Sequence, residues 1–258
     1  MFELPLLNTV ILLSSGVCLT WDNCELIYCL SALPFSSPRV PATKRIGPHH
    51  EDVISIFIGA LLGDGCMEKD GNGFRFCFYQ VAKHIEYILW LHSTLFNHGY
   101  CKKDIPQIFS RTSPPPPTHP TPPEWGGVGE EGAYYCRFKT FTFSSFGWIY
   151  DSFYINKVKV VPGFIKEYLT PLALAVWIMD DGGWIKNRGL KLATNCFKKS
   201  DVELLAGILR DRYDLKVSIV SAGKINQYCI YIPKASIPKL VGIVKPHIHP
   251  IFLYKFNL

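Results

Sequence analysis

The chain has 258 residues, of which 48% are hydrophobic and 19% charged, and these proportions are those of a folded, soluble protein with a full core. Lysine and arginine outnumber aspartate and glutamate by 27 to 21, and the whole surplus of +6 lies in residues 49–258, which suits a polyanionic partner without identifying one. The nine cysteines form no CxxC pair, which excludes zinc-ribbon spacing and indicates free, mostly buried thiols in a reducing compartment.

Residues 1–48 form an extension with no readable chemistry. Leu4–Thr20 is mostly apolar, but no lysine or arginine precedes it, so it is a poor secretory signal. Its length is marginal for a membrane span. Four prolines between Pro34 and His50 indicate a linker.

The chain then shows a first succession of helices and strands. Ile54–Leu62 has helical apolar spacing, residues 74–79 alternate as a half-buried strand, and Lys83–Phe96 has the single apolar face of an amphipathic helix. Two further strands and a helix are expected after these elements, at Gly99–Phe109, Tyr134–Phe143 and Phe146–Ile155. The proline- and glycine-rich block 112–132 can form neither a helix nor a central strand, so we expect an exposed, flexible loop inserted in this succession.

A second succession of the same kind begins at Thr170. Thr170 is the expected N-cap of a helix that has Pro171 as its first residue and runs to about Met179. Ser200 and Glu203 have the spacing of a capping box at the start of a later helix. The remaining expected elements are a strand, that helix, a hairpin and a closing helix, at Leu190–Leu192, Val202–Tyr213, Lys216–Val220 with Gln227–Ile232, and Ile237–Val244.

Each succession opens with an apolar stretch that ends in Asp-Gly, namely Phe57–Gly65 and Leu174–Gly182. Asp64 lies 95 positions before Lys159, whereas Asp181 lies 74 positions before Lys255. The difference equals the length of the block 112–132, so removing that block brings the two units into register. The two lysines are taken from the family resemblance given below, so this agreement is a consistency check. One Asp-Gly alone would simply end a helix in a turn, but two in matching successions favour a shared site.

The two aspartates predict a metal site. Gly59 and Gly63 lie on one helix face, where small residues let the other motif helix approach. Asp64 and Asp181 then meet at helix C-termini, where the dipoles are already negative. A divalent cation removes this conflict, and hard oxygen ligands favour Mg²⁺, which could activate a water for attack on a phosphodiester.

The second motif departs from the first at two positions. In this register Asp180 takes the place of Gly63 and Val176 that of Gly59, so the second helix lacks the small residues. The packing is therefore expected to be looser or asymmetric, and Asp180 is a candidate second ligand.

Over residues 51–256 these motifs resemble those of LAGLIDADG homing endonucleases of the single-chain, two-motif type encoded in mitochondrial introns. The second half carries the stronger match, at Tyr168–Gly183, Ile243–Pro250 and Leu253–Phe256. The resemblance implies an α+β fold of two pseudo-symmetric αββαββα units, with the motif helices packed at the centre and the β-sheets forming a DNA-binding saddle. The units would be residues 49–165, with the insertion at 112–132, and residues 166–258.

The resemblance also implies roles for single residues. Asp64 and Asp181 match the catalytic metal ligands, and Lys159 and Lys255 match basic residues near the scissile phosphates, with Lys157 as a competitor for Lys159. Gln80 and Asn195 occupy similar polar places after the first strand of each unit.

On this interpretation the polar strand faces contact DNA, since two-stranded ribbons fit the major groove. The alternative is a solvated sheet face. The candidate DNA-binding residues, including the two just named, are Arg75, Tyr79, Gln80, Arg137, Lys139, Lys186, Arg188, Lys191, Asn195, Lys216, Ser218, Lys224, Gln227 and Tyr231.

The leading hypothesis is thus a site-specific, Mg²⁺-dependent double-strand DNA endonuclease that promotes intron mobility in the mitochondrion. It would act as a monomer with no obligate protein partner. The alternative is a maturase that binds the host intron RNA and assists group I splicing, and a third class is a membrane-associated protein anchored by Leu4–Thr20. The eight histidines show no HExxH or zinc-finger spacing and predict no further site.

Overall fold

A computed structural model describes residues 11–12, 18–19, 39–110 and 134–258. The proline-rich block 112–132 and most of the apolar stretch Leu4–Thr20 lie outside the described residues. Within the described ranges, no helix has both the length and the apolar character that a membrane span requires. The N-terminal extension contributes the short pair β1 (Ile11–Leu12) and β2 (Cys18–Leu19).

The first unit has the order helix, two strands, helix, two strands, helix. Its sheet has the strand order β3-β4-β6-β5, and all of its pairs are antiparallel. The elements are α1 (Glu51–Leu62), β3 (Cys66–Asp70), β4 (Gly73–Val81), α2 (Ile85–Asn97), β5 (Gln107–Ser110), β6 (Tyr134–Lys139) and α3 (Gly147–Phe153).

The second unit repeats this order after a connection made of β7 (Tyr154–Ile155), β8 (Val158–Lys159) and α4 (Ile165–Tyr168). Its sheet order is β9-β10-β12-β11, which is the same topology as in the first unit. The elements are α5 (Pro171–Asp181), β9 (Gly182–Ile185), β10 (Gly189–Ala193), α6 (Lys199–Asp211), β11 (Ser218–Ser221), β12 (Tyr228–Pro233) and α7 (Ile237–Val244), followed by the 3₁₀ turns η6 (Lys245–His247) and η7 (Pro250–Phe256). The predicted pair of αββαββα units is confirmed.

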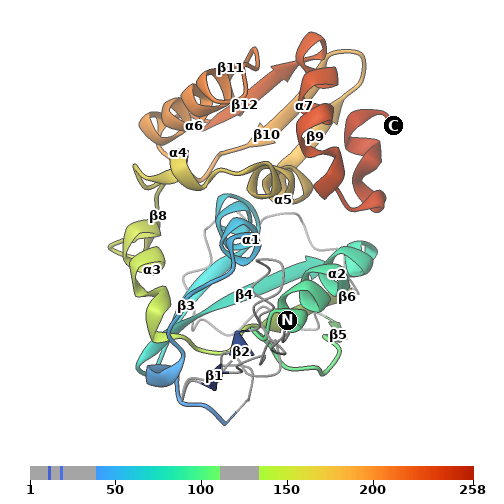
Figure 1. Cartoon of the computed structure of the whole chain (residues 1–258). Coiled ribbons are helices and arrows are strands. Elements are labelled where there is room, and N and C mark those ends of the chain that lie inside the picture. Colours follow the sequence, from blue (N-terminus) through green and yellow to red (C-terminus); the bar gives the residue numbers. More distant parts are fainter. Residues whose placement is uncertain (1–10, 13–17, 20–38, 111–133) are drawn as a thin grey trace, which may run out of the picture.

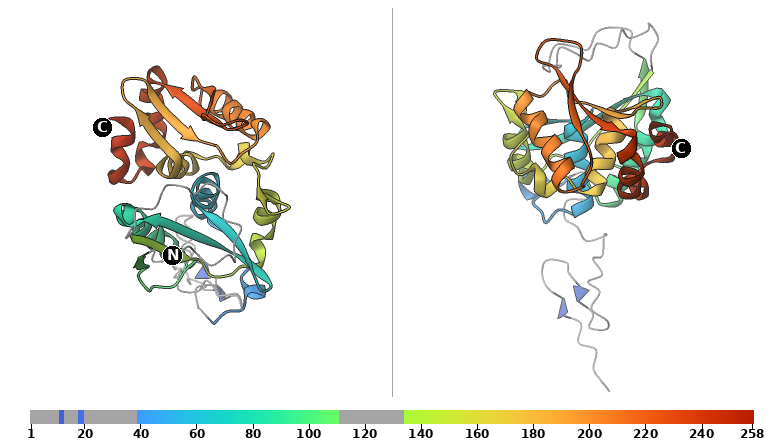
Figure 2. Two further views of the ribbon diagram at one scale, coloured as in Figure 1. Left: turned by 180° about the vertical axis from the view of Figure 1, so that it is seen from behind. Right: turned by 90° about the horizontal axis from the view of Figure 1, so that it is seen from above.

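Helices α1 and α5 pack against each other at the centre of the molecule. In Figure 1 the first unit lies below and the second above, and the two motif helices meet between them. Figure 2 shows the same arrangement from behind and from above. Both helices are buried on nearly all sides, from Val53 to Leu62 and from Ala173 to Met179, which explains why their sequences are apolar throughout.

Two glycines of α1 allow this close approach. A Cβ atom at Gly59 would lie 2.4 Å from the carbonyl oxygen of Ala173 and 2.7 Å from Cβ of Val176. A Cβ atom at Gly63 would lie 2.5 Å from Cβ of Asp180. The packing is asymmetric, as expected, but it is tight: each glycine of α1 accommodates the larger residue that replaces it in α5.

Some local predictions are confirmed. The hydroxyl of Thr170 caps α5 by accepting from the backbone N–H of Ala173 at 3.1 Å, and Pro171 is the first helical residue. The hairpin formed by β11 and β12 and the closing helix α7 also lie where the pattern indicated.

Two local predictions need correction, and two strands were missed. The capping box at Ser200 is not formed, because α6 starts at Lys199 with Lys198 as its N-cap, and the hydroxyl of Ser200 donates to Asp201 instead. Strand β5 begins only at Gln107, so the segment from Gly99 onwards is largely loop. Strands β3 and β9, which follow each Asp-Gly directly, were not visible as patterns because they are short and β3 carries three charged residues.

The contact between the motif helices yields a first prediction. Replacing Gly59 by alanine should lower the free energy of unfolding by about 2 kcal/mol, because the added methyl group meets backbone that cannot move aside. The matched control is Gly207→Ala in α6, where no atom lies within 4 Å of the new Cβ and helix propensity favours alanine. Urea denaturation measures both variants; equal stability of the two would contradict the tight helix contact.

Candidate active site

The two motif aspartates lie at adjoining helix ends. Asp64 follows Gly63, the C-cap of α1, and Asp181 is the last residue of α5. Because α1 and α5 pack side by side, their C-terminal ends come together, and the charge of Asp64 reaches far enough to raise the pKa of Asp181. The expected meeting of one carboxylate from each unit is therefore present in the structure.

Asp180 joins the two units beside this pair. Its Oδ2 atom accepts a hydrogen bond from the backbone N–H of Asp64 at 3.3 Å, and its Oδ1 atom accepts from the hydroxyl of Tyr87 at 2.9 Å. Tyr87 is fully buried in α2 of the first unit. Asp180 is thus a cross-unit tether, and Gly63 leaves the space that its side chain needs.

Gln80, a residue of strand β4, forms a hydrogen bond with the carboxylate of Asp64. Its Nε2 donates to Oδ2 of Asp64 at 2.6 Å, and its side chain lies on the helix-facing side of β4 together with Phe76 and Phe78. Gln80 is 8% exposed, so the structure places it beside the aspartates and not among the surface side chains with which it was grouped.

The proposed equivalence of Gln80 and Asn195 is wrong. The register pairs Cys66 with Cys77 in the first sheet and Gly183 with Lys191 in the second. Cys66 and Gly183 each lie two residues after their aspartate, so Thr194 is the counterpart of Gln80.

Within the described residues, neither Thr194 nor Asn195 forms a hydrogen bond with Asp181. The hydroxyl of Thr194 donates to the carbonyl of Tyr228 at 2.7 Å, and the side-chain oxygen of Asn195 accepts from Cys229 Sγ at 3.0 Å. The strand expected as the first of each unit is in fact the second, because β3 and β9 precede β4 and β10. Gln80 lies within the second strand of its unit, and Asn195 lies just after the second strand of its own.

The two motif lysines cap the helix ends. Nζ of Lys159 donates to the carbonyls of Gly63 and Gly65 at 3.1 and 2.9 Å. Nζ of Lys255 donates to the carbonyls of Ile178 and Met179 at 3.1 and 2.5 Å. Each ammonium group therefore satisfies carbonyls that the end of its helix leaves unpaired. Lys157 lies in the exposed β7–β8 turn and makes no such contact within the described part of the chain.

Burial and mutual repulsion dominate the electrostatics of the site. Burial, followed by the charge of Asp64, raises the pKa of Asp181 to about 8, although Lys159 and Lys255 act against this shift. Burial also raises the pKa of Asp64, and it raises the pKa of Asp180 well above the usual range, with the charges of Asp64 and Asp181 adding to the effect. Burial lowers the pKa of Lys255 to about 8 despite the three nearby carboxylates.

This donor set fits a hard divalent cation. Among the described residues, none donates a hydrogen bond to the carboxylate of Asp181, and the carboxylate of Asp64 receives only the Gln80 bond. Two carboxylates under mutual repulsion, with oxygen atoms available, are what Mg²⁺ or a similar ion neutralises. Asp64 and Asp181 are the residues that would hold it.

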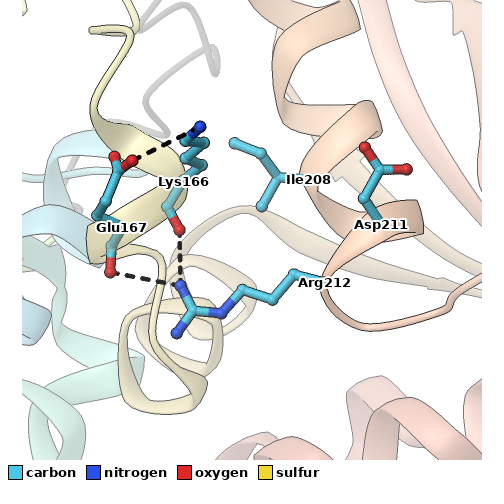
Figure 3. A pocket seen from close by; sticks show the side chains of 5 residues that line it. All are labelled: Lys166, Glu167, Ile208, Asp211 and Arg212. Carbon is cyan, nitrogen blue, oxygen red and sulfur yellow. Dashed lines mark hydrogen bonds and ion pairs between the residues drawn. The ribbon is translucent and has the colours of Figure 1, made fainter.

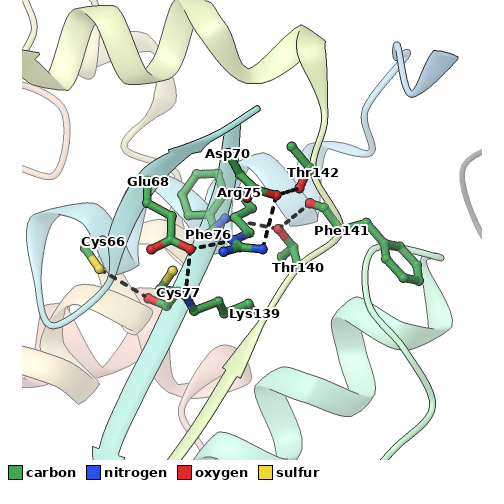
Figure 4. A network of polar contacts seen from close by, with 10 residues as sticks. All are labelled: Cys66, Glu68, Asp70, Arg75, Phe76, Cys77, Lys139, Thr140, Phe141 and Thr142. Carbon is green, nitrogen blue, oxygen red and sulfur yellow. Dashed lines mark hydrogen bonds and ion pairs between the residues drawn. The ribbon is translucent and has the colours of Figure 1, made fainter. Parts of the chain in front are cut away.

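Two cations of the first sheet, Arg75 and Lys139, are engaged in ion pairs (Figure 4). Arg75 donates to Glu68 Oε1 at 2.5 Å and to Asp70 Oδ2 at 3.1 Å, and Lys139 donates to Glu68 Oε1 at 2.6 Å. The sequence interpretation missed Glu68, whose place opposite Arg75 depends on strand β3. Tyr79 and Arg137 are direct cross-strand neighbours, so they share this face, and Arg137 also lies against the ring of Phe109.

The second sheet carries cations without acidic neighbours on its strands. Lys191, Tyr231 and Ser218 are paired across β10, β12 and β11, so they share one face. None of these four strands contains an aspartate or glutamate. The other predicted residues lie at the strand ends: Lys186 and Arg188 between β9 and β10, Lys216 before β11, and Lys224 and Gln227 between β11 and β12.

A surface hollow of about 440 Å³ lies away from the aspartates, where α4 meets α6 (Figure 3). Arg212 crosses it and donates to the carbonyls of Lys166 and Glu167 at 2.6 and 3.3 Å. The hollow therefore lies where the connection between the units packs against α6. None of its lining residues belongs to the motif site, by which we mean Asp64, Asp181 and the residues around them.

Comparison with known proteins agrees with this architecture. The profile of the LAGLIDADG DNA endonuclease family matches residues 54–240. The chain is 40% identical over 225 residues to cytochrome b mRNA maturase bI2 of Saccharomyces cerevisiae, a match that covers 83% of this chain and 49% of the relative. It is 43% identical over 123 residues to intron-encoded endonuclease ai4 of Dictyostelium discoideum, covering 47% of this chain and 77% of that protein. The chain thus spans about half the length of the yeast relative.

A solved structure is similar over most of the chain. The homing endonuclease I-WcaI, bound to its DNA recognition sequence, superimposes with a TM-score of 0.67 at 26% identity. The match covers 85% of this chain and 94% of that protein. The similarity thus extends over both units.

The raised pKa of Asp181 predicts a pH-dependent stability. In the unfolded chain this carboxyl ionises near pH 3.9, whereas in the folded cation-free protein it keeps its proton up to about pH 8. The folded state therefore binds more protons at this carboxyl between these values, so the melting temperature should fall as the pH rises from about 6.5 to 8. Below that range, burial lowers the pKa of His49 to about 4, which acts in the opposite direction. Lys255 has its folded pKa at about 8 and its unfolded pKa higher, so it opposes this trend only above that window.

Two comparisons check this expectation by calorimetry. Mg²⁺ should raise the melting temperature more at pH 8 than at pH 5, because it replaces the protons, and Asp181→Asn should flatten the pH dependence. A cation-free protein whose melting temperature is constant between about pH 6.5 and 8 would refute the assignment.

The tether of Asp180 predicts a contrast between two substitutions. Asp180→Ala should lower the free energy of unfolding by about 1–3 kcal/mol, because it leaves the N–H of Asp64 and the hydroxyl of Tyr87 without partners. Asp180→Asn should be close to the parent protein, since an amide can accept from the N–H and donate to the hydroxyl while removing a charge from the cluster. Chemical denaturation without divalent ions distinguishes the two; equal losses would argue against the tether.

Proposed function

Because the chain belongs to the LAGLIDADG DNA endonuclease family, we propose that it is a site-specific endonuclease that cuts both strands of a DNA duplex with a divalent metal ion, by preference Mg²⁺. The observation that carries this proposal is the meeting of Asp64 and Asp181, one from each unit, at the ends of two packed helices. Hydrolysis of two strands needs two reaction centres, and a chain with two units can provide both as a monomer, without a protein partner.

The residues around the aspartates have distinct roles in this proposal. Asp64 and Asp181 hold the ion, which when bound lowers the pKa of a water and neutralises charge on the phosphate. Gln80 fixes the orientation of Asp64, and Asp180 fixes the backbone at the same residue.

The two lysines supply positive charge where the scissile phosphates approach. Lys159 and Lys255 are held at the helix ends by their bonds to carbonyls, so their ammonium groups are positioned before any substrate arrives. Such prepositioned charge stabilises the additional negative charge that develops on a phosphate during hydrolysis.

The two sheets form the proposed DNA surface, and the charged residues of each sheet have a different role. On the second sheet the face of Lys191, Ser218 and Tyr231 is free of strand carboxylates, so its cations serve phosphate binding. On the first sheet Glu68 and Asp70 hold Arg75 and Lys139 in fixed directions, which suits hydrogen bonding to base edges. The similarity to an endonuclease bound to its recognition sequence supports this assignment.

The proposed setting is the mitochondrion, with intron mobility as the outcome of the cut. Relatives named as an intron-encoded endonuclease and as a cytochrome b mRNA maturase support this placement. The second of these names also favours a second function, namely binding of the host intron RNA and assistance to its splicing. This chain spans only about half of that maturase. We therefore keep RNA binding as a second candidate function and test it separately from DNA cleavage.

Cleavage by the purified protein tests the main proposal. In Mg²⁺, the protein should cut DNA that contains the joined exons of its host gene, and Asp64→Asn or Asp181→Asn should slow the cut by at least about a hundredfold. Both variants should still bind the target in Ca²⁺ by gel shift. The exposed Asp211→Asn in α6 is the matched control and should cut normally.

The outcomes distinguish the two functions. A folded protein that leaves its true target intact in Mg²⁺ would refute the endonuclease. If the double variant Asp64→Asn, Asp181→Asn still promotes intron splicing in a reconstituted assay, the maturase function is present and independent of the carboxylates. Failure of the parent protein in the splicing assay would remove the second candidate.

A further inference from the structure

Two histidines and an aspartate meet at the opposite end of α1 from Asp64. His50 is the N-cap of α1, Asp52 lies in its first turn, and His98 is the C-cap of α2. Each offers one ligand atom, and the three atoms all lie within 4.8 Å of one another. Since α1 has 12 residues, about 18 Å of helix separates this cluster from the motif site.

A hydrogen bond of its Nδ1 leaves Nε2 as the nitrogen of His98 that a metal ion could bind. Its Nδ1 lies 2.9 Å from the carbonyl of Thr94, which can only accept, so the ring carries its hydrogen on Nδ1. The lone pair of the neutral ring is then at Nε2. Metal-binding histidines in proteins are typically fixed in this way, by a bond from the other ring nitrogen to a carbonyl or carboxylate.

Two hydrogen-bond acceptors, Nδ1 of His50 and Oδ2 of Asp52, lie close together. Nδ1 of His50 accepts from the backbone N–H of Asp52 at 3.2 Å, so its lone pair lies on that side of the ring. The same nitrogen lies 3.7 Å from Oδ2 of Asp52. A cation in this place would exchange one long capping bond for two metal–ligand bonds. The rings of His50 and His98 are 4.6 Å apart between centroids, which brings the third ligand alongside.

We propose that His50, Asp52 and His98 bind a divalent transition-metal ion of the Zn²⁺ class, with water as the fourth ligand. Two imidazoles and a carboxylate favour such an ion over Mg²⁺, which prefers oxygen ligands. Tetrahedral bonds of about 2.0–2.1 Å place ligand atoms roughly 3.4 Å apart, so the longest separation in the cluster must shorten by up to about 1.4 Å. The side chains of His50 and Asp52 are 54% and 58% exposed, so they can rotate to do so.

The ion would link the two helices of the first unit that position the motif site. Helix α1 ends two residues before Asp64, and α2 carries Tyr87, whose hydroxyl donates to Asp180. Binding would therefore tie the start of α1 to the end of α2 and stabilise both. This role is structural and is independent of the proposed cleavage activity.

Zinc titration of the full chain tests the proposal. Chelator-treated protein is titrated with Zn²⁺ in a reducing buffer that contains excess Mg²⁺ to saturate the carboxylate pair. One equivalent should bind and raise the melting temperature. His98→Gln and His50→Asn should weaken binding by roughly tenfold or more. Asparagine is a good N-cap, so the second variant keeps the start of α1 intact while it removes an imidazole.

The matched control is His247→Asn, which changes a histidine of η6 outside the cluster and should bind Zn²⁺ as the parent does. Substitution with Co²⁺ identifies the ligands, because thiolate coordination adds a charge-transfer band that imidazole and carboxylate do not. The proposal is overturned if Zn²⁺ does not bind, if His98→Gln and His50→Asn bind as tightly as the control, or if the Co²⁺ spectrum shows sulfur ligands.

Discussion

The contact between α1 and α5 is the constraint on which the rest of the structure depends. Gly59 and Gly63 bring the backbones so close that no side chain fits between them at these points. That proximity sets the two units against each other, and it brings the C-terminal ends of two buried helices to one place. Asp64 and Asp181 lie close together because the two helices that lead to them pack against each other.

The same geometry concentrates unfavourable charge. Three carboxylates, from Asp64, Asp180 and Asp181, lie where two helix dipoles are negative, and burial raises the pKa of all three. The surroundings offset part of this cost. Lys159 and Lys255 bind the terminal carbonyls, and Gln80 and Tyr87 each donate to one carboxylate. The repulsion that these groups do not offset favours binding of a cation. The same repulsion lowers the stability of the cation-free protein, so a higher affinity for the ion comes with a lower stability without it.

Much of this arrangement could be predicted from the sequence, and the limits have physical causes. The motif helices, the Thr170 cap and the pairing of Asp64 with Asp181 follow from apolar spacing and from the repeat. The Asp180 tether could not be found, because its partner Tyr87 lies in another unit and no local pattern links them. Thr194 was passed over for Asn195 because the shift of one residue depends on the register of β9, a strand too short to show alternation. Glu68 was missed for the same reason in β3.

The glycines also determine which halves can associate. Gly59 faces Val176 and Gly63 faces Asp180, and each pair consists of positions that are equivalent under the internal repeat. Two copies of the second half would set valine against valine and carboxylate against carboxylate on the axis that relates them, while two copies of the first would leave voids there. The halves are therefore complementary and not interchangeable. Symmetric self-association, which a duplicated fold would otherwise invite, is disfavoured, and each half has its better partner in the other half of the same chain.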